Sequence, residues 1–202
     1  MEHKNTQQQI FDAAVELFRQ KGYAGATIRE IARMVRIKES SIYNHYTSKE
    51  EIFDCVLNEF KNGIVSNRPS ESELTNLVAA ISPADIIKLI FLKYVNNEEV
   101  KYDKIARIIF IEQYINKRAE DFFMKYMVEE PIEYYKKIFA MMAAAGRIED
   151  SDYTSHVEEL HYGFLGLMME QVHARKGEQR NDSILQKMIR HVNFVFEHIK
   201  IL

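Results

Sequence analysis

The chain has 202 residues and a formal net charge of −3, with seven glycines, three prolines, no tryptophan and a hydrophobic fraction of 47%. An average chain of this length carries roughly 14 glycines and 10 prolines, so turn-forming residues are scarce here. The composition excludes a disordered chain, and it excludes all-β sandwiches and barrels, which need a turn about every 8–12 residues. We therefore expect an all-α protein with long helices and short connections.

The sequence also excludes several classes of site and location. A single cysteine, Cys55, can form neither an internal disulfide nor a cysteine-rich zinc site. No segment approaches the roughly 18 uncharged apolar residues of a transmembrane helix, and residues 1–9 are too polar for a signal peptide. We expect a cytoplasmic protein with no membrane partner.

Charge is distributed unevenly along the chain. Residues 1–49 contain eight Lys or Arg and five Asp or Glu, so this segment carries +3 and the remainder carries −6. Such an asymmetry is typical of a chain whose basic end binds a polyanion, although three charges alone are a weak signal.

The spacing of apolar residues predicts four helices in the N-terminal part, at residues 6–21, 28–35, 39–46 and 48–63. Thr27 followed three residues later by Glu30 predicts a capping box at the start of the second helix. Gly22 and Gly63 are expected to end the first and the fourth helix. Two short helices joined by a tight turn and packed on a longer one form a helix-turn-helix.

The third of these helices has an unusual composition. Only Ile42 and Tyr46 are clear core residues, while the rest of the segment 38–46 consists of Ser, Tyr, Asn, His and charged residues. A helix with so little apolar surface stabilises a core poorly, but its size suits a DNA major groove about 12 Å wide. Side chains of these types bind base edges and phosphates. We interpret residues 39–46 as a DNA recognition helix.

Two segments carry a resemblance to a known family: Gly-Tyr-Ala-Gly-Ala-Thr-Ile-Arg-Glu-Ile-Ala at 22–32 and Ser-Ile-Tyr-Asn-His-Tyr-Thr-Ser-Lys-Glu-Glu-Ile-Phe at 41–53. They resemble the tetracycline-repressor (TetR) family of transcriptional regulators, and the similarity covers about residues 7–57. The resemblance implies an N-terminal three-helix DNA-binding domain followed by a helical-bundle domain for ligand binding and dimerisation. We expect the boundary between these domains at residues 62 and 63.

The resemblance also implies roles for individual residues in DNA binding. Thr27 would cap the second helix and contact a phosphate, Asn44 could pair with an adenine edge, and Lys49 would reach a further phosphate. The complete set of expected DNA-binding residues is Thr27, Arg29, Lys38, Ser40, Ser41, Tyr43, Asn44, His45 and Lys49.

Three positions depart from the family pattern. Arg36 stands where the family usually has a turn glycine, and a left-handed backbone there would cost an arginine about 1 kcal/mol, so we expect a locally different turn. Glu39 stands where the family often has Lys, and a carboxylate near phosphates is repulsive unless it accepts a hydrogen bond from a cytosine amino group. Ser40 replaces Gly or Pro. These departures affect the expected base sequence rather than DNA binding itself.

The segment 66–72 is the best linker candidate because it concentrates Ser, Pro and charge. Beyond it, the sequence predicts helices at residues 83–97, 101–115, 118–145, 152–175 and 182–201. Pro131 should kink or split the third of these.

The C-terminal region is rich in aromatic residues and methionine, most of which belong in a core. The resemblance implies that a subset lines a small-molecule site, which such side chains would make adaptable and mostly apolar. The expected ligand-binding residues are Phe91, Tyr94, Phe110, Tyr114, Phe123, Tyr126, Tyr134, Phe164 and Met168.

The last two predicted helices each carry an apolar stripe. Gly163 and Gly166 lie within the first of them at a cost of about 1 kcal/mol each, which suits a close approach by another helix. We expect these helices to form a four-helix homodimer interface, whereas the alternative is that both stripes face the chain's own core. The expected interface residues are Leu160, Gly163, Phe164, Leu167, Met188, Val192, Val195 and Phe196.

No catalytic motif is present in the C-terminal region. Glu158/His161 and Glu170/His173 both match the E-x-x-H pattern of di-iron bundles. Because they lie twelve residues apart on one predicted helix, about 18 Å, they cannot share one dinuclear site. We expect no metal and no cofactor.

The sequence predicts a homodimeric transcriptional regulator that acts as a repressor. It would bind a palindromic operator and be released from it by an unknown small-molecule effector. The competing classes are an enzyme built on a helical bundle, which lacks convergent catalytic groups, and a helical protein-interaction module without DNA binding.

Overall fold

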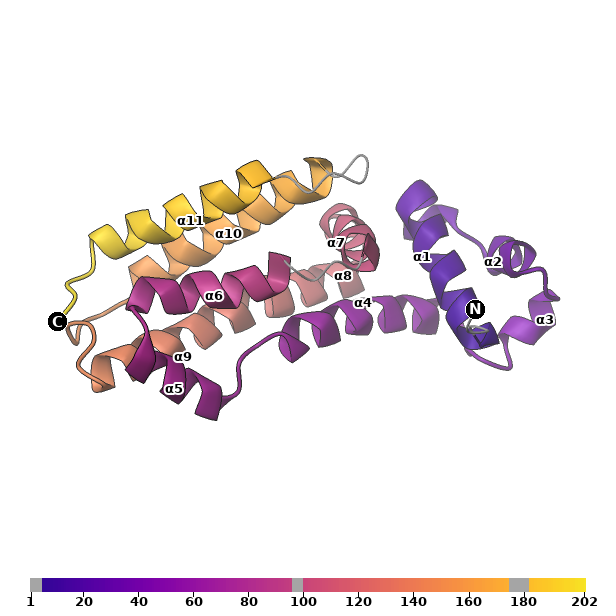
Figure 1. Ribbon diagram of the computed structural model, residues 1–202. Coiled ribbons are helices and arrows are strands. Elements are labelled where there is room, and N and C mark those ends of the chain that lie inside the picture. Colours follow the sequence, from indigo (N-terminus) through magenta and orange to yellow (C-terminus); the bar gives the residue numbers. More distant parts are fainter. Residues whose placement is uncertain (1–4, 96–99, 175–181) are drawn as a thin grey trace. The chain divides into compact units, whose positions relative to one another are not determined.

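The computed structural model describes residues 5–95, 100–174 and 182–202. Within these ranges the chain forms helices and one isolated antiparallel bridge between Ile148 and Ile201, which confirms the all-α fold class. The helices, shown in Figure 1, are α1 (Thr6–Gly25), α2 (Ile28–Val35), α3 (Glu39–Ile42), α4 (Lys49–Ser66), α5 (Glu71–Ala80), α6 (Pro83–Val95), α7 (Val100–Glu112), α8 (Lys117–Phe122), η1 (Phe123–Glu129), α9 (Glu130–Ala144), α10 (Thr154–Ala174) and α11 (Asp182–Glu197). None of the described helices combines the length and apolar character that crossing a membrane requires.

The chain divides into two compact units. The first contains Met1–Gly63 and Glu99–Phe123, and the second contains Ile64–Glu98 and Met124–Leu202. Helices α7 and α8, which follow α6 in sequence, therefore belong to the same unit as α1 to α3 and most of α4.

In the first unit, α1 packs against both α2 and α7. Its buried face includes Ile10, Ala14 and Phe18. The Phe18 ring packs edge-on against Phe53 of α4, with ring centroids 5.6 Å apart. These contacts make α1 the central helix of the unit.

Two glycines in the first unit act differently from a simple helix stop. Gly22 has φ 72° and ψ 168°, a conformation that essentially only glycine adopts, yet the chain resumes helical hydrogen bonding and α1 extends to Gly25. Gly63 does not end α4, which runs to Ser66. A Cβ atom at Gly63 would overlap the ring of Tyr102 in α7, so this glycine permits close packing.

In the second unit, α10 and α11 lie side by side, α6 packs on α11, and α9 packs on α10 (Figure 1). Helix α5, which the sequence analysis did not identify, contacts α6 and α9 and begins with a capping box between Ser70 and Glu73. The Arg147 guanidinium donates hydrogen bonds to the Val78 and Ile81 carbonyls at 2.9 and 2.8 Å, which satisfies the carboxyl end of α5.

The expected break at Pro131 is confirmed as a change of helix type. The π-helix η1 ends at Glu129 and α9 starts at Glu130. In an α-helix the N–H of residue 131 would bond to the carbonyl of residue 127, but proline has no N–H. The Met127 carbonyl instead accepts a hydrogen bond from His161 Nε2 of α10, at 2.8 Å.

The apolar stripes of α10 and α11 face the core of their own unit. Of the eight residues expected at a dimer interface, six are buried within the single chain and two are partly exposed, Gly163 and Leu167. The buried six are Leu160, Phe164, Met188, Val192, Val195 and Phe196. This outcome corresponds to the alternative in which the stripes form the chain's own core.

The two mid-helix glycines have different environments. A Cβ atom at Gly163 would overlap the His191 imidazole of α11, so this glycine permits a close approach of α11 within the chain. Gly166 has open space around its Cβ position and is exposed. The outward-facing apolar residues of these helices are Tyr162, Met169 and Phe194.

Candidate nucleic-acid interface

Helix α2 begins with the predicted capping box. Thr27 Oγ1 accepts a hydrogen bond from Glu30 N at 3.2 Å, and Glu30 Oε2 accepts one from Thr27 N at 3.1 Å. The prediction for this cap is confirmed. Ile31 and Ala32 face the core, while Thr27 and Arg29 at the start of the helix are exposed.

The turn between α2 and α3 keeps a left-handed residue without a glycine. Arg36 has φ 60° and ψ 40°, so the expectation of a locally different turn is wrong. Its N–H bonds back to the Arg33 carbonyl, and the Ile37 N–H bonds to the Ala32 carbonyl at 3.0 Å. These bonds satisfy the carboxyl end of α2 and offset the conformational cost of about 1 kcal/mol that a left-handed arginine carries.

Helix α3 and the turn after it present a polar face. Only Ile42 and Tyr46 are buried, and the Tyr46 hydroxyl donates to the Gln7 carbonyl of α1 at 3.4 Å. Ser41 is partly exposed. The exposed residues of this segment are Lys38, Glu39, Ser40, Tyr43, Asn44 and His45. The structure thus brings six of the nine predicted DNA-binding residues together on one short segment.

Lys49 has a different environment from the one that the resemblance implied. Its Nζ donates to the carbonyls of Tyr23 and Ala26, each at 2.9 Å, and lies 4.3 Å from the centre of the Tyr23 ring. The ammonium therefore binds the connection between α1 and α2. These bonds hold the connection in place.

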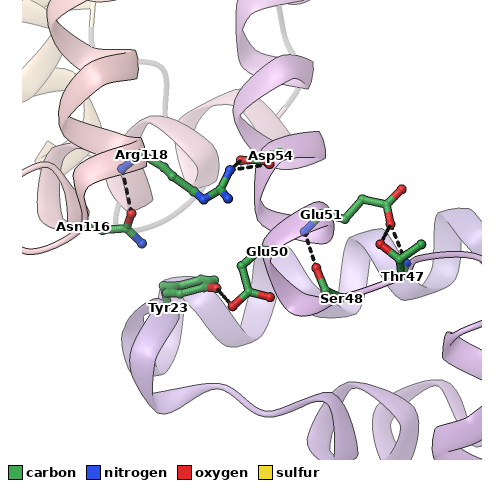
Figure 2. A network of polar contacts seen from close by, with 8 residues as sticks. All are labelled: Tyr23, Thr47, Ser48, Glu50, Glu51, Asp54, Asn116 and Arg118. Carbon is green, nitrogen blue, oxygen red and sulfur yellow. Dashed lines mark hydrogen bonds and ion pairs between the residues drawn. The ribbon is translucent and has the colours of Figure 1, made fainter.

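The start of α4 is held by a network of polar contacts (Figure 2). Ser48 Oγ accepts from Glu51 N at 3.1 Å, as expected for a cap, and Thr47 Oγ1 donates to Glu51 Oε2 at 2.7 Å. Tyr23 reaches across from α1, where its hydroxyl donates to Glu50 Oε1 at 2.9 Å. Burial and the neighbouring Glu50 carboxylate raise the pKa of Tyr23 to about 12, so the hydroxyl remains a donor at neutral pH.

Helices α7 and α8 complete the support of this region within the first unit. Glu112 at the end of α7 is only 2% exposed, and its Oε1 accepts from the Tyr23 N–H at 2.7 Å. Arg118 of α8 donates to both carboxylate oxygens of Asp54 in α4, at 3.0 and 2.7 Å (Figure 2). These contacts could not be predicted from local patterns, because Glu112 lies 89 residues from Tyr23 along the chain.

The residues expected to bind a ligand divide between the two units. Phe110, Tyr114 and Phe123 belong to the first, and the side chain of Tyr94 lies outside the described residues. Tyr114 is 81% exposed and cannot line an enclosed site. The second unit contains Phe91, Tyr126, Tyr134, Phe164 and Met168.

Part of this second-unit set forms an aromatic cluster around Phe164. Its ring centroid lies 4.2 Å from that of Phe91 and 6.1 Å from that of Tyr135. His191 packs edge-on against Phe164 at 5.6 Å. Tyr135 and His191 were not predicted, since their spacing resembles that of ordinary core residues.

His161, one of the residues in the E-x-x-H patterns, is 6% exposed and bonded to the Met127 carbonyl. Burial lowers the pKa of His161, which favours the neutral ring that donates through Nε2. Within the described ranges, no group of three His, Cys, Asp or Glu side chains is arranged to hold a metal ion.

Comparison with known proteins gives the same assignment as the local motifs. Residues 10–56 match the model of the family described as bacterial regulatory proteins, tetR family. The chain is 50% identical over 44 residues to the biofilm operon icaADBC HTH-type negative transcriptional regulator IcaR of Staphylococcus epidermidis. That match covers 22% of this chain and 24% of IcaR, so the chain spans about a quarter of the length of this relative.

The whole chain resembles solved structures in fold. A TetR-family transcriptional regulator from Mesorhizobium loti superposes with a TM-score of 0.70 at 18% identity, over 98% of this chain and 100% of that one. The flavonoid-responsive regulator FrrA superposes with a TM-score of 0.67 at 16% identity, over 96% and 97% of the two chains. Residues 10–56 therefore form the helix-turn-helix of TetR-family regulators, and the described residues share the all-helical fold of these solved structures.

Proposed function

We propose that this protein is a homodimeric transcriptional repressor, rather than an enzyme, that binds a palindromic operator in the cytoplasm. The observation that carries the proposal is the exposed polar face of α3 next to a capped α2, on a segment that matches the TetR family model. Phosphate contacts come from Thr27, Arg29 and Tyr43, and base contacts come from residues on α3 and on the turn after it. A second copy, related by a two-fold axis, would place its own α3 in the other half-site.

The operator-binding test is an electrophoretic mobility shift with the DNA upstream of the protein's own gene, at several salt concentrations. The affinity should fall steeply with salt, with a slope of about −0.9 per phosphate contact. Tyr43→Ala should weaken binding to all sequences, whereas Asn44→Ala should relax the preference at one base position by about 5- to 150-fold. Weak binding with no sequence preference, or no binding, would reject the proposal.

We propose the exposed face of α10 and α11 as the dimer surface. Tyr162, Gly166 and Met169 follow one another at intervals of four and three residues on α10 and therefore share a face. Phe194 is the exposed aromatic residue of α11. Large apolar side chains around an exposed glycine suit close packing of helices from a second copy.

We predict that Tyr162→Arg combined with Phe194→Glu converts the dimer to a monomer, because both changes place charge in an apolar interface. Sedimentation equilibrium of the full chain measures this directly. The matched control is Ile115→Glu, which charges another exposed apolar residue, 74% exposed, in the first unit. If the double variant stays dimeric, the interface lies elsewhere.

The effector of this repressor is a small molecule bound within the second unit. The candidate residues for this site include Phe91 and Phe164, which belong to an aromatic cluster with Tyr135. Such a ligand would change operator affinity only in so far as it binds one conformation of the dimer better than the other.

A further inference from the structure

We propose that Glu39 is a specificity-determining residue that accepts a hydrogen bond from the exocyclic amino group of a cytosine in each operator half-site. This inference rests on the proposed function, because it assigns a base to one residue of the same DNA-binding surface. Glu39 stands at a position where the family often has Lys, so the family's usual contacts do not predict a contact of this residue with cytosine.

Glu39 lies on the exposed face of α3. It is the first residue of that helix, and the buried residues are Ile42 and Tyr46. Ser40 is next to Glu39 in the helix, and Tyr43 and Asn44 lie in the turn that directly follows the helix. All four are exposed. Glu39 therefore belongs to the surface that enters the groove.

Nothing in the described part of the chain neutralises this carboxylate. The other acidic residue between positions 27 and 46 is Glu30, which is bonded to Thr27 and Lys21. Glu39 makes no hydrogen bond or ion pair with any residue in the described ranges. Lys38 before it makes no side-chain cap, so the start of α3 is not organised around the Glu39 carboxylate.

DNA chemistry then restricts what Glu39 can bind. Phosphates repel a carboxylate, so a stable contact must be with a base edge. In the major groove, guanine presents the acceptors N7 and O6, and thymine presents the acceptor O4 and a methyl group, so neither can donate to Glu39. Adenine offers its N6 amino group beside the N7 acceptor, which repels the second carboxylate oxygen. Cytosine offers its N4 amino group without an adjacent acceptor on the same base, and it is the common partner of acidic side chains.

The surrounding cations fit the same arrangement. Arg29, Arg33, Arg36 and Lys38 are all exposed in this part of the first unit. They provide attraction to the phosphates on either side of the groove, so that one carboxylate directed at the bases lowers overall affinity only modestly while it discriminates among sequences. Glu39 thus contributes through rejection of guanine and thymine as well as attraction to cytosine.

The test is selection from a randomised duplex library with the full-length protein, followed by affinity measurements on the selected operator. Wild type should enrich cytosine at one position in each half-site, and a change of that base to thymine should weaken binding by at least about fivefold. Glu39→Gln should move the preference from cytosine to adenine, because glutamine pairs with adenine N6 and N7. Glu39→Ala should lose the preference at that position alone.

The control is Glu129→Gln, which removes an exposed carboxylate outside the first unit and should leave the selected sequence unchanged. Both Glu39 variants should keep the thermal stability of wild type, since the residue is exposed. The inference is overturned if the Glu39 variants select the same operator as wild type. It is also overturned if these variants bind every duplex more tightly by one common factor, because Glu39 then only repels phosphates. If wild type itself selects no operator, it is the proposed function that has failed.

Discussion

Replacing Glu112 by alanine should lower the free energy of unfolding of the first unit by about 2–4 kcal/mol. The Glu112 carboxylate is buried and accepts from the Tyr23 N–H at 2.7 Å. Alanine leaves this N–H without its acceptor, at a cost of about 1–3 kcal/mol, and also leaves a cavity at the end of α7. Urea denaturation followed by circular dichroism measures the loss.

Glu112→Gln is the matched control, because the carboxamide keeps an acceptor oxygen of the same shape and removes a buried charge. Its stability should lie within about 1 kcal/mol of wild type. An alanine variant as stable as the glutamine variant would show that the bond to Tyr23 contributes nothing. Gly22 permits this contact, since a Cβ atom at this position would lie 3.0 Å from Glu112 Oε1.

The same substitution should weaken operator binding. Tyr23 is linked to α4 through the Lys49 contact with its carbonyl and the hydroxyl bond to Glu50. The connection that follows Tyr23 leads directly to the Thr27 cap of α2. Loss of the Glu112 bond should therefore loosen the placement of α2 and α3. Glu112 is buried, so this effect on binding does not come from a DNA contact of its own.

The parts of this structure that could be predicted from sequence are those set by neighbouring residues. Thr27 and Glu30 are three residues apart, so their capping box needs no tertiary information. The recognition segment was identified because it contains too few apolar residues to serve a core. The hydrogen bonds of Lys49 could not be predicted, because its acceptors, Ala26 and Tyr23, lie 23 and 26 residues away along the chain.

The apolar stripes of α10 and α11 show a different limit. A stripe at helical spacing records only that a face is buried, and burial in the chain's own core gives the same pattern as burial against a second copy. Leu160 and Val192 are core residues, whereas Tyr162 and Phe194, which interrupt the stripes, are the exposed ones. Arg36 shows that even a correct estimate of local strain does not predict the conformation when hydrogen bonds of the turn offset it.

Replacing His161 by leucine should destabilise the second unit by about 1–3 kcal/mol, because leucine fills the space but leaves the Met127 carbonyl without its imidazole donor. Pro131 supplies no N–H at the position from which an α-helix would bond to this carbonyl. Pro131→Ala should provide that donor, so the double variant His161→Leu, Pro131→Ala should be more stable than the sum of the two single effects predicts, by about 1 kcal/mol. Denaturation of all four proteins measures this coupling, and strictly additive effects would contradict it.

The pH dependence provides a second measurement on the same residue. Burial lowers the pKa of His161 below its usual 6.5, so the unfolded chain takes up this proton at a higher pH than the folded chain. The associated stability is present above pH 6.5 and is lost as the pH falls toward the lower folded-state pKa. The stability difference between wild type and His161→Leu should therefore shrink over this range, because leucine has no proton to bind. If the stability difference between the two proteins stays constant from pH 8 to about pH 5, the fold does not hold His161 in its neutral form. A charged imidazole would then donate the hydrogen bond to the Met127 carbonyl as well.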